Sequence, residues 1–152
     1  MNYIQSYYPP EDSTCFGCGY SNPQGLHVKS YWQDGEAVCR YTPGPEQTAY
    51  GRVVVYGGLL ACLIDCHSVA TAIAAAYAAE GRDIASLPRI AYVTGSLNVT
   101  YQAPTPLGPE LALRAWVQEA LPKKSLVVCE LSAGGKVTVR GETMAVRAKW
   151  AA

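Results

Sequence analysis

One carboxylate in this sequence has surroundings that suggest chemistry. Asp65 lies in an apolar run, residues 53–79, that is rich in Ala, Leu and Ile. Removing a charged carboxylate from water costs free energy unless hydrogen bonds or opposite charges compensate it. A carboxylate kept at such a place can act as a general base or as a nucleophile. Asp65 is therefore the first catalytic candidate, and a structural acid bonded to Ser or Thr hydroxyls is the alternative.

A glycine pair, Gly57-Gly58, opens the helix that this apolar run predicts. The first N–H groups of a helix have no internal partner and carry partial positive charge, so a developing oxyanion can approach them closely where side chains are absent. Close packing of the helix on a sheet is the alternative reason for the pair. Eight residues separate Gly57 from Asp65, roughly 12 Å along the helix axis. One helix therefore cannot bring both groups to one carbonyl, and a site that uses both requires two subunits.

Three polar side chains follow Asp65 on the same helix. His67 lies about 200° around the helix from Asp65, so we expect a hydrogen-bonded core or interface histidine rather than a catalytic one. Ser68 is a candidate for substrate binding. We expect the hydroxyl of Thr71 to bond back to the helix backbone.

The hydrophobic pattern predicts an α+β fold with the order β-β-α-β-β-β-β. Two short strands at 26–32 and 37–42, joined by a turn at 33–35, precede the helix, which should be buried all round. Four strands follow at 89–102, 111–120, 125–133 and 137–150, with a β-bulge expected at 141–143. In the strand 89–102, alternation places Thr94 and Ser96 on one face, where they contact either substrate or solvent.

The overall composition limits the class of protein. With 152 residues the chain fits one domain, which we expect at 15–152 after a lead-in at 1–14. Twelve basic and twelve acidic residues cancel, so neither nucleic acid nor a membrane surface is an expected partner. Asp65 and His67 argue against a membrane-spanning helix. The first ten residues lack the pattern of a signal peptide, so we expect a cytoplasmic protein.

Six cysteines are spread along the chain. Cys15 and Cys18 have the spacing of metal ligands, but we expect no second Cys pair or His pair to complete a tetrahedral site, and His27 and Cys39 are the only spare ligands expected nearby. Cys62 and Cys66, one helical turn apart in the apolar run, are expected as small core residues. The sequence therefore predicts free thiols and no bound metal.

Three motifs resemble those of one enzyme family. The stretch Y-G-G-L-L-A-C-L-I-D, residues 56–65, resembles the H-G-G-x-x-A-x-x-x-D/E signature of hotdog acyl-CoA thioesterases of the phenylacetate-pathway type. C-F-G-C-G-x-x-N-P-x-G-L at 15–26 and T-G-S-L-N-V-T-Y-Q-A-P-T-P-L-G at 94–108 are also similar to that family. The resemblance implies a hotdog fold, in which a curved antiparallel sheet wraps one long central helix. It also implies that Asp65 is the nucleophile or general base and that the Gly57 amide, with Gly58 beside it, is the oxyanion donor.

Two positions depart from the family pattern. Tyr56 stands where the signature has His; a phenol can donate a hydrogen bond but is no base near neutral pH. Tyr50 stands six residues earlier, where relatives often have Asn or Gln, and Gln47 is a nearby substitute. Tyr50, Tyr56 and Gln47 are therefore candidates for substrate binding.

The resemblance implies an acyl-CoA thioesterase that needs no cofactor, since coenzyme A is part of its substrate. We expect a homodimer with shared active sites, possibly assembled further into a homotetramer. Two alternatives remain at this point. One is an acyl-thioester dehydratase or hydratase, which would need a His paired with a carboxylate, and the other is an acyl-CoA binding protein without activity.

Overall fold

The computed structural model describes residues 1–149 of the chain. Six strands and one long helix follow one another in the predicted order: β1 (Ser30–Gln33), β2 (Glu36–Tyr41), α1 (Gly57–Ala79), β3 (Tyr92–Tyr101), β4 (Leu111–Ala120), β5 (Lys124–Ala133) and β6 (Lys136–Arg147). Three short 3-10 helices lie at Ile4–Tyr7, Pro10–Asp12 and Tyr50–Arg52. The predicted α+β class is confirmed; Trp150, at the end of the predicted last strand, lies outside the described residues.

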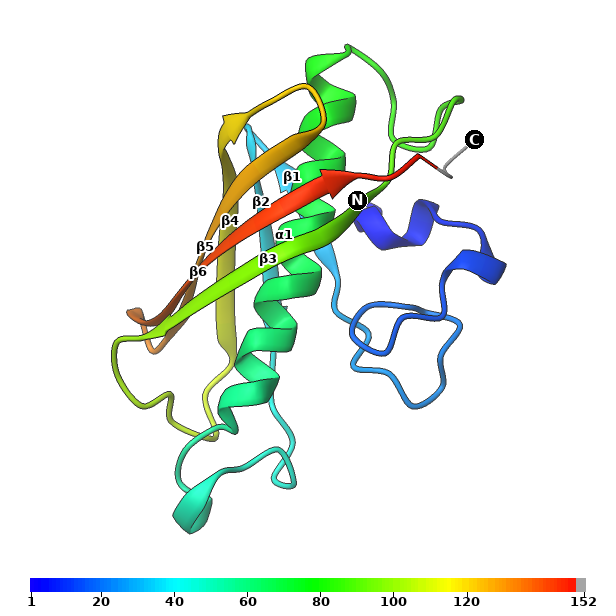
Figure 1. The fold of residues 1–152 in the computed structure, drawn as a ribbon. Coiled ribbons are helices and arrows are strands. Elements are labelled where there is room, and N and C mark those ends of the chain that lie inside the picture. The colour runs from blue at the N-terminus through cyan, green and yellow to red at the C-terminus, as the bar shows by residue number, and fades with distance from the viewer. Residues whose placement is uncertain (150–152) are drawn as a thin grey trace.

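All strand pairs are antiparallel, and the spatial order of the strands is β1-β2-β4-β5-β6-β3. The sheet curves around α1 (Figure 1), which is the arrangement of the hotdog fold and confirms that expectation. Because β3 pairs with β6 on one side only, it forms an edge of the sheet along its ten residues. An exposed edge of this length presents unpaired backbone groups to a further strand.

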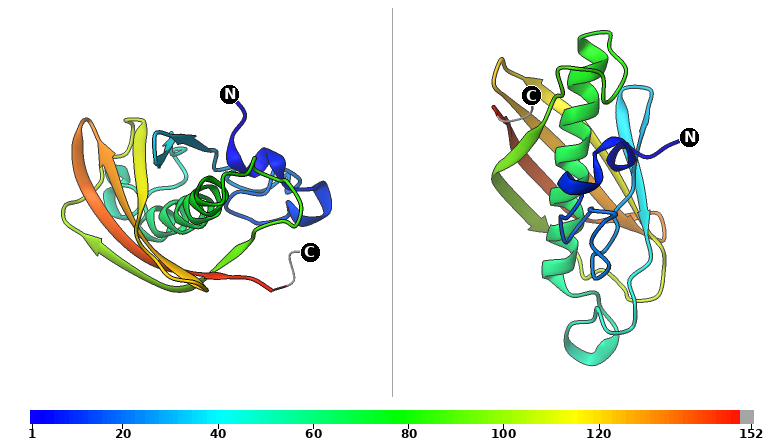
Figure 2. Two further views of the ribbon diagram at one scale, coloured as in Figure 1. Left: turned by 90° about the horizontal axis from the view of Figure 1, so that it is seen from above. Right: turned by 90° about the vertical axis from the view of Figure 1, so that its right-hand side faces the viewer.

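The helix α1 forms the centre of the core. It is long and apolar enough to cross a membrane by length and composition, but 61% of its most apolar 18-residue window is buried inside the protein. The sheet covers one side of α1, and the N-terminal segment lies on the side that the sheet leaves open (Figure 2). An apolar helix covered on both sides is the core helix that the sequence predicted.

The N-terminal residues, expected as a lead-in, pack on the domain. Ile4 is 1% exposed and contacts Ala70 and Ala74 of α1. The side chain of Gln5 donates to Ser30 Oγ at 3.0 Å and accepts from Ser30 N at 2.9 Å. These contacts join the first 3-10 helix to both α1 and β1.

Two hairpin turns agree with the sequence. Asp34 and Gly35 between β1 and β2 have φ values of 48° and 89°, and Gly134 and Gly135 between β5 and β6 have 57° and 79°. Two consecutive positive φ values are typical of the two-residue turns whose twist matches that of the strands.

The predicted bulge in the last strand is wrong. Residues 141–143 of β6 pair regularly with both neighbours, and the register shift lies instead at Thr138, which has no partner on β5. The buried face of β6 consists of Val139, Gly141, Thr143 and Ala145 rather than the expected Met144 and Val146. Gly141 faces α1, and a Cβ there would lie only 2.4 Å from Cγ2 of Ile64, so this position has no room for a side chain. Hydrophobicity alone misassigned this face, because the helix approaches too closely for larger side chains.

Candidate functional site

Asp65 lies at the edge of a cavity of about 540 Å³. The carboxylate is half-buried in the described chain, and its Oδ1 accepts a hydrogen bond from the hydroxyl of Thr94 on β3. Cys66 and Val69 of α1, together with residues of the N-terminal segment and the start of β3, also line the cavity. The carboxylate is thus held in place while part of it remains accessible from a mostly apolar cavity.

A β-bulge at Gly95 decides which side chains of β3 reach Asp65. Thr94 pairs with Ala145 and Ser96 pairs with Met144, so Gly95 has no partner on β6. The extra residue places Thr94 on the face that meets α1 and Ser96 on the opposite face. The prediction that Thr94 and Ser96 share a face is therefore wrong. Gly95 was not singled out from the sequence, although a glycine inside a strand pattern is a signal for a bulge.

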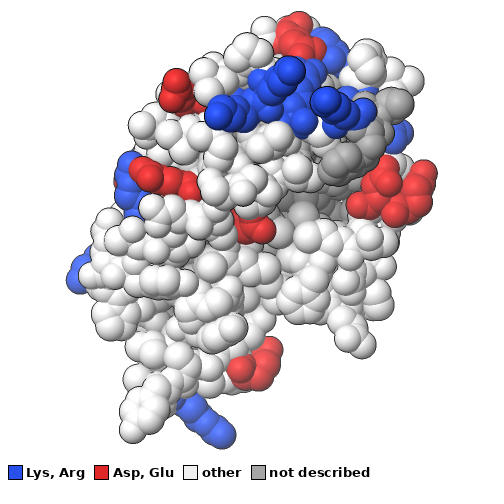
Figure 3. Space-filling view, viewed as in Figure 1, with Lys and Arg blue, Asp and Glu red and all other residues white. Residues whose placement is uncertain are grey.

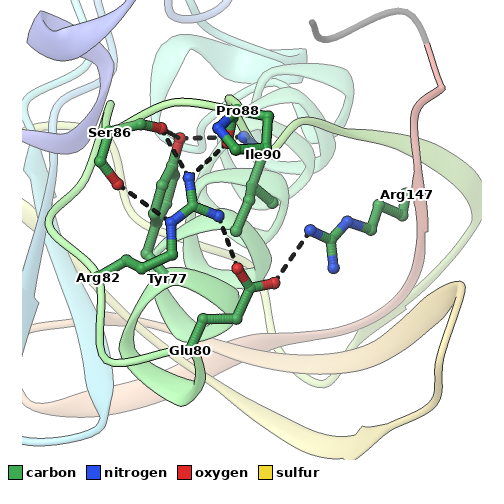
Figure 4. A network of polar contacts seen from close by, with 7 residues as sticks. All are labelled: Tyr77, Glu80, Arg82, Ser86, Pro88, Ile90 and Arg147. Atoms are coloured by element: carbon green, nitrogen blue, oxygen red, sulfur yellow. Dashed lines mark hydrogen bonds and ion pairs between the residues drawn. The ribbon is translucent and has the colours of Figure 1, made fainter.

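A polar network fixes the connection between α1 and β3, which carries Thr94 to Asp65 (Figure 4). Arg82 donates to the side chain of Ser86 at 3.2 Å and to its carbonyl at 2.8 Å. Glu80 accepts from Arg82 at 2.6 Å and from Arg147 of β6 at 3.0 Å. Tyr77 Oη accepts from Ile90 N at 2.9 Å, which anchors the chain just before β3. These bonds hold the segment before β3 against the end of α1, and so help to position Thr94 of β3 beside Asp65.

The first turn of α1 presents two free N–H groups. Leu59 and Leu60 donate to the carbonyl of Tyr56, whereas Gly57 N and Gly58 N have no hydrogen-bond partner within residues 1–149. The hydroxyl of Tyr101, at the end of β3, donates to Gly57 O at 2.7 Å and fixes this end of the helix. Sequence reasoning did not single out Tyr101, because no spacing rule connects it to a helix start 44 residues away.

Tyr56 folds back over this first turn. Tyr56 is 57% exposed, and a Cβ placed on Gly58 would lie 2.4 Å from the Tyr56 hydroxyl oxygen. Gly58 thus gives the phenol room beside the free N–H groups. Tyr50, in the 3-10 helix that precedes α1, is 96% exposed.

Gln47 stabilises its own loop. Its Oε1 accepts from Gly44 N at 2.9 Å, and its amide lies 2.9 Å from the Tyr41 hydroxyl. Its carbonyl accepts from Tyr56 N at 3.1 Å. This substrate-binding candidate is occupied by bonds that position the loop before the helix.

Ser68 lies apart from the cavity. The side chain is fully buried, and its hydroxyl has no hydrogen-bond partner among residues 1–149. It does not line the cavity that Asp65 lines. The structure therefore gives this substrate-binding candidate no route to a ligand there.

His67 and Thr71 have the structural roles that the sequence predicted. His67 is fully buried; its Nδ1 lies 2.8 Å from Ser30 Oγ, and its Nε2 donates to Ala37 O at 3.1 Å. Burial lowers the pKa of His67 from 6.5 to about 4. Thr71 donates to the carbonyl of His67 at 2.7 Å. Both predictions are confirmed, and both nitrogens of the imidazole are engaged.

Cys66 lies in the hydrophobic core, as the sequence predicts, but the surroundings of the N-terminal cysteines differ from the expectation. The Sγ atoms of Cys15, Cys18 and Cys66 all lie within 4.8 Å of one another, so the expectation that only His27 and Cys39 lie nearby as spare ligands is wrong. Hydrogen bonds with the thiols of Cys18 and Cys66 hold the pKa of Cys15 well below its usual range. The bond with Cys15 is the main cause that raises the pKa of Cys18 to about 12. Cys39 lies in the core, and His27 bonds to Asn22 O at 2.6 Å.

Comparison with known proteins places this arrangement in a family. No family model and no curated protein sequence matches the chain. Among solved structures, a thioesterase superfamily protein from Shewanella loihica PV-4 is 38% identical, with 84% of this chain and 94% of that protein covered and a TM-score of 0.62. This chain belongs to the thioesterase superfamily.

More distant structures show the same fold as this thioesterase superfamily member. The Escherichia coli PaaI protein, from the phenylacetic acid degradation operon, is 17% identical, with 81% of this chain and 80% of that protein covered and a TM-score of 0.65. The protein smu.793 from Streptococcus mutans UA159, solved bound to acetyl CoA, is 12% identical, with 80% and 88% covered and a TM-score of 0.65. At these identities the similarity concerns the fold.

Proposed function

We propose that this chain hydrolyses acyl-CoA thioesters, with Asp65 as the catalytic carboxylate. The observation that carries the proposal is the Asp65 carboxylate, held by Thr94 at the edge of a cavity of about 540 Å³. Membership of the thioesterase superfamily supports a thioester substrate, and the acetyl CoA bound to smu.793 supports coenzyme A as the thiol part. Coenzyme A is part of the substrate, so the reaction needs no cofactor.

Asp65 accepts the proton of a water that attacks the thioester carbonyl, or attacks that carbonyl directly. The C–S bond then breaks, and the products are a carboxylate, the coenzyme A thiol and a proton. The negative charge that develops on the carbonyl oxygen is stabilised by the free N–H group of Gly57, assisted by the adjacent Gly58. The Tyr56 phenol beside Gly58 is a further donor to the substrate in place of histidine.

The active site is shared between two subunits. Gly57 and Asp65 lie eight residues apart on one straight element, roughly 12 Å along α1, so they cannot serve one carbonyl within one chain. The free edge of β3 is the surface for the second copy, because a two-fold axis lets identical strands pair antiparallel. Exposed apolar side chains near the helix start, including Val53 and Tyr101, would become covered there. Two such dimers could associate further into a tetramer.

Basic side chains gather on the upper part of one face of the molecule, over the C-terminal end of α1 (Figure 3). Arg147, which is partly exposed at the end of β6, belongs to this end of the fold. Phosphate groups bind arginine and lysine side chains through charge-assisted hydrogen bonds. This region is therefore our candidate for the phosphates of coenzyme A.

Incubation of the protein with a panel of acyl-CoAs tests the proposal, with the released coenzyme A thiol measured by chromatography. Asp65→Asn should keep the fold and lower kcat by about 10²-fold or more, because an amide neither attacks nor accepts the proton. Asp34→Asn is the matched control: it also removes one carboxylate, but from an exposed turn with a φ of 48° that asparagine tolerates. Near wild-type turnover of Asp65→Asn would refute the assignment.

An acyl-CoA binding protein without activity is the second candidate, and the position of Tyr56 favours it. The phenol lies over the helix start that would meet the oxyanion. Binding of acyl-CoAs at micromolar concentration without thiol release would identify this function. A dehydratase or hydratase is not supported, since the buried His67 bonds through both nitrogens and does not face Asp65.

A further inference from the structure

Three cysteines from two distant parts of the sequence meet beside the cavity, and a fourth, Cys62, lies next to them on α1. Cys15 and Cys18 lie in the N-terminal loop, and Cys62 and Cys66 lie one turn apart on α1. The Sγ atoms of Cys15 and Cys66 are 3.9 Å apart, and that of Cys18 lies within 4.8 Å of both. A Cβ placed on Gly17 would lie 2.3 Å from Cys66 Sγ and 3.2 Å from Cys62 Sγ. Both thiols of the helix therefore point at the middle of the Cys15–Cys18 turn.

The distance between the sulfurs of Cys15 and Cys66 matches a metal centre. Zinc binds thiolates at about 2.3 Å in a tetrahedron, which places sulfur atoms about 3.8 Å apart. A disulfide requires about 2.05 Å. The observed 3.9 Å between Cys15 and Cys66 agrees with the tetrahedron. Two residues separate Cys15 from Cys18 in the loop, and one helical turn separates Cys62 from Cys66. Each pair can therefore supply two ligands from one side of the metal.

The loop is shaped to present Cys15 to a cation. Gly19 N donates to Cys15 O at 2.8 Å, which closes the turn, and Val28 N donates to Gly17 O at 3.0 Å. Gly17 also has to lack a side chain, because a Cβ would occupy the space of Cys66 Sγ.

We propose that Cys15, Cys18, Cys62 and Cys66 bind one Zn²⁺ in a tetrahedral site that fastens the N-terminal loop to α1. The thiols release their protons to solvent as the four Zn–S bonds form, and no oxidation or reduction occurs. Four protein ligands leave no open position, so the metal is structural. Cys66 follows Asp65, and Cys15, Cys18 and Cys66 line the cavity, so the metal braces the cavity wall next to the carboxylate. The proposal stands whether or not the chain hydrolyses thioesters.

The metal content of the full chain tests the proposal. Protein that has been reduced, loaded with Zn²⁺ and desalted should retain about one zinc per chain by elemental analysis. Cys15→Ser changes an exposed loop residue and removes one of the four thiolates, so the zinc retained after desalting should fall by about twofold or more. Cys39→Ala removes a core thiol outside the cluster and should retain about one zinc. No retained zinc in the wild-type protein, or equal retention in Cys15→Ser, would overturn the proposal.

Cobalt identifies the fourth ligand. Co²⁺ in the same site should give intense sulfur-to-metal absorption, and Cys62→Ala should lower that intensity by about a quarter, in proportion to the thiolates lost. An unchanged cobalt spectrum would remove Cys62 from the ligand set. Counting the free thiols of denatured, unreduced protein tests for a disulfide instead of a metal. The chain has six cysteines, so a metal-free protein with two thiols missing from this number would contain a disulfide, and the zinc site would be wrong.

Discussion

The buried histidine makes the stability of the protein depend on pH in a way that can be calculated. The pKa of His67 is about 4 in the folded chain, against 6.5 for an exposed imidazole. Between these two pH values the unfolded state binds a proton that the folded state does not, so the free energy of unfolding falls as the pH falls. At about 1.4 kcal/mol for each pKa unit, the loss due to His67 is about 3 kcal/mol by pH 4. Above pH 6.5 the free energy of unfolding is no longer reduced by the protonation of His67, and below pH 4 this reduction has reached its full size.

Urea unfolding at pH 7.5 and pH 4 measures this loss, and variants separate it from the titration of carboxylates. His67→Gln cannot take up a proton, so its free energy of unfolding should fall by about 3 kcal/mol less than that of the wild type over this interval. The glutamine should also lower stability at pH 7.5, because the bonds to Ser30 and Ala37 change. His27→Gln, at the exposed histidine, controls for the removal of an imidazole as such. An equal loss in wild type and His67→Gln would refute the reasoning.

Two further predictions concern the proposed active site. Thr94→Val should lower kcat/KM by about 10- to 150-fold, because it removes a hydrogen bond to a charged group. Ser96→Val, on the opposite face of β3, should change kcat/KM little. Equal effects of the two substitutions would contradict the face assignment at the Gly95 bulge. Gly57→Trp and Asp65→Asn should each inactivate the protein, and mixing them with subunit exchange should restore about a quarter of the activity, because half of the dimers are mixed and each has one intact site. No recovery despite demonstrated exchange would place both groups within one chain.

Long, regular patterns in the sequence determined the order of elements. The apolar run over α1, the alternation over 89–102 and the glycine-containing turns predicted the helix and most strands to within a few residues. Local chemistry also sufficed for His67 and Thr71, because the direction of a helical side chain follows from its position in the helix. For the same reason the separation of Gly57 and Asp65 could be stated from spacing alone.

The tertiary structure decided which side chains meet. The unpaired Gly95 reverses the faces of β3, and an extra residue at Thr138 shifts the register of β6, because the side chains of a strand alternate with a period of two. Gly141 faces the core since the helix approaches it closely, which no hydrophobicity scale expresses. The cysteine cluster depends on a contact between Cys15 and Cys66, 51 residues apart. Spacing rules describe one element at a time, and contacts between elements become known only when the chain has folded.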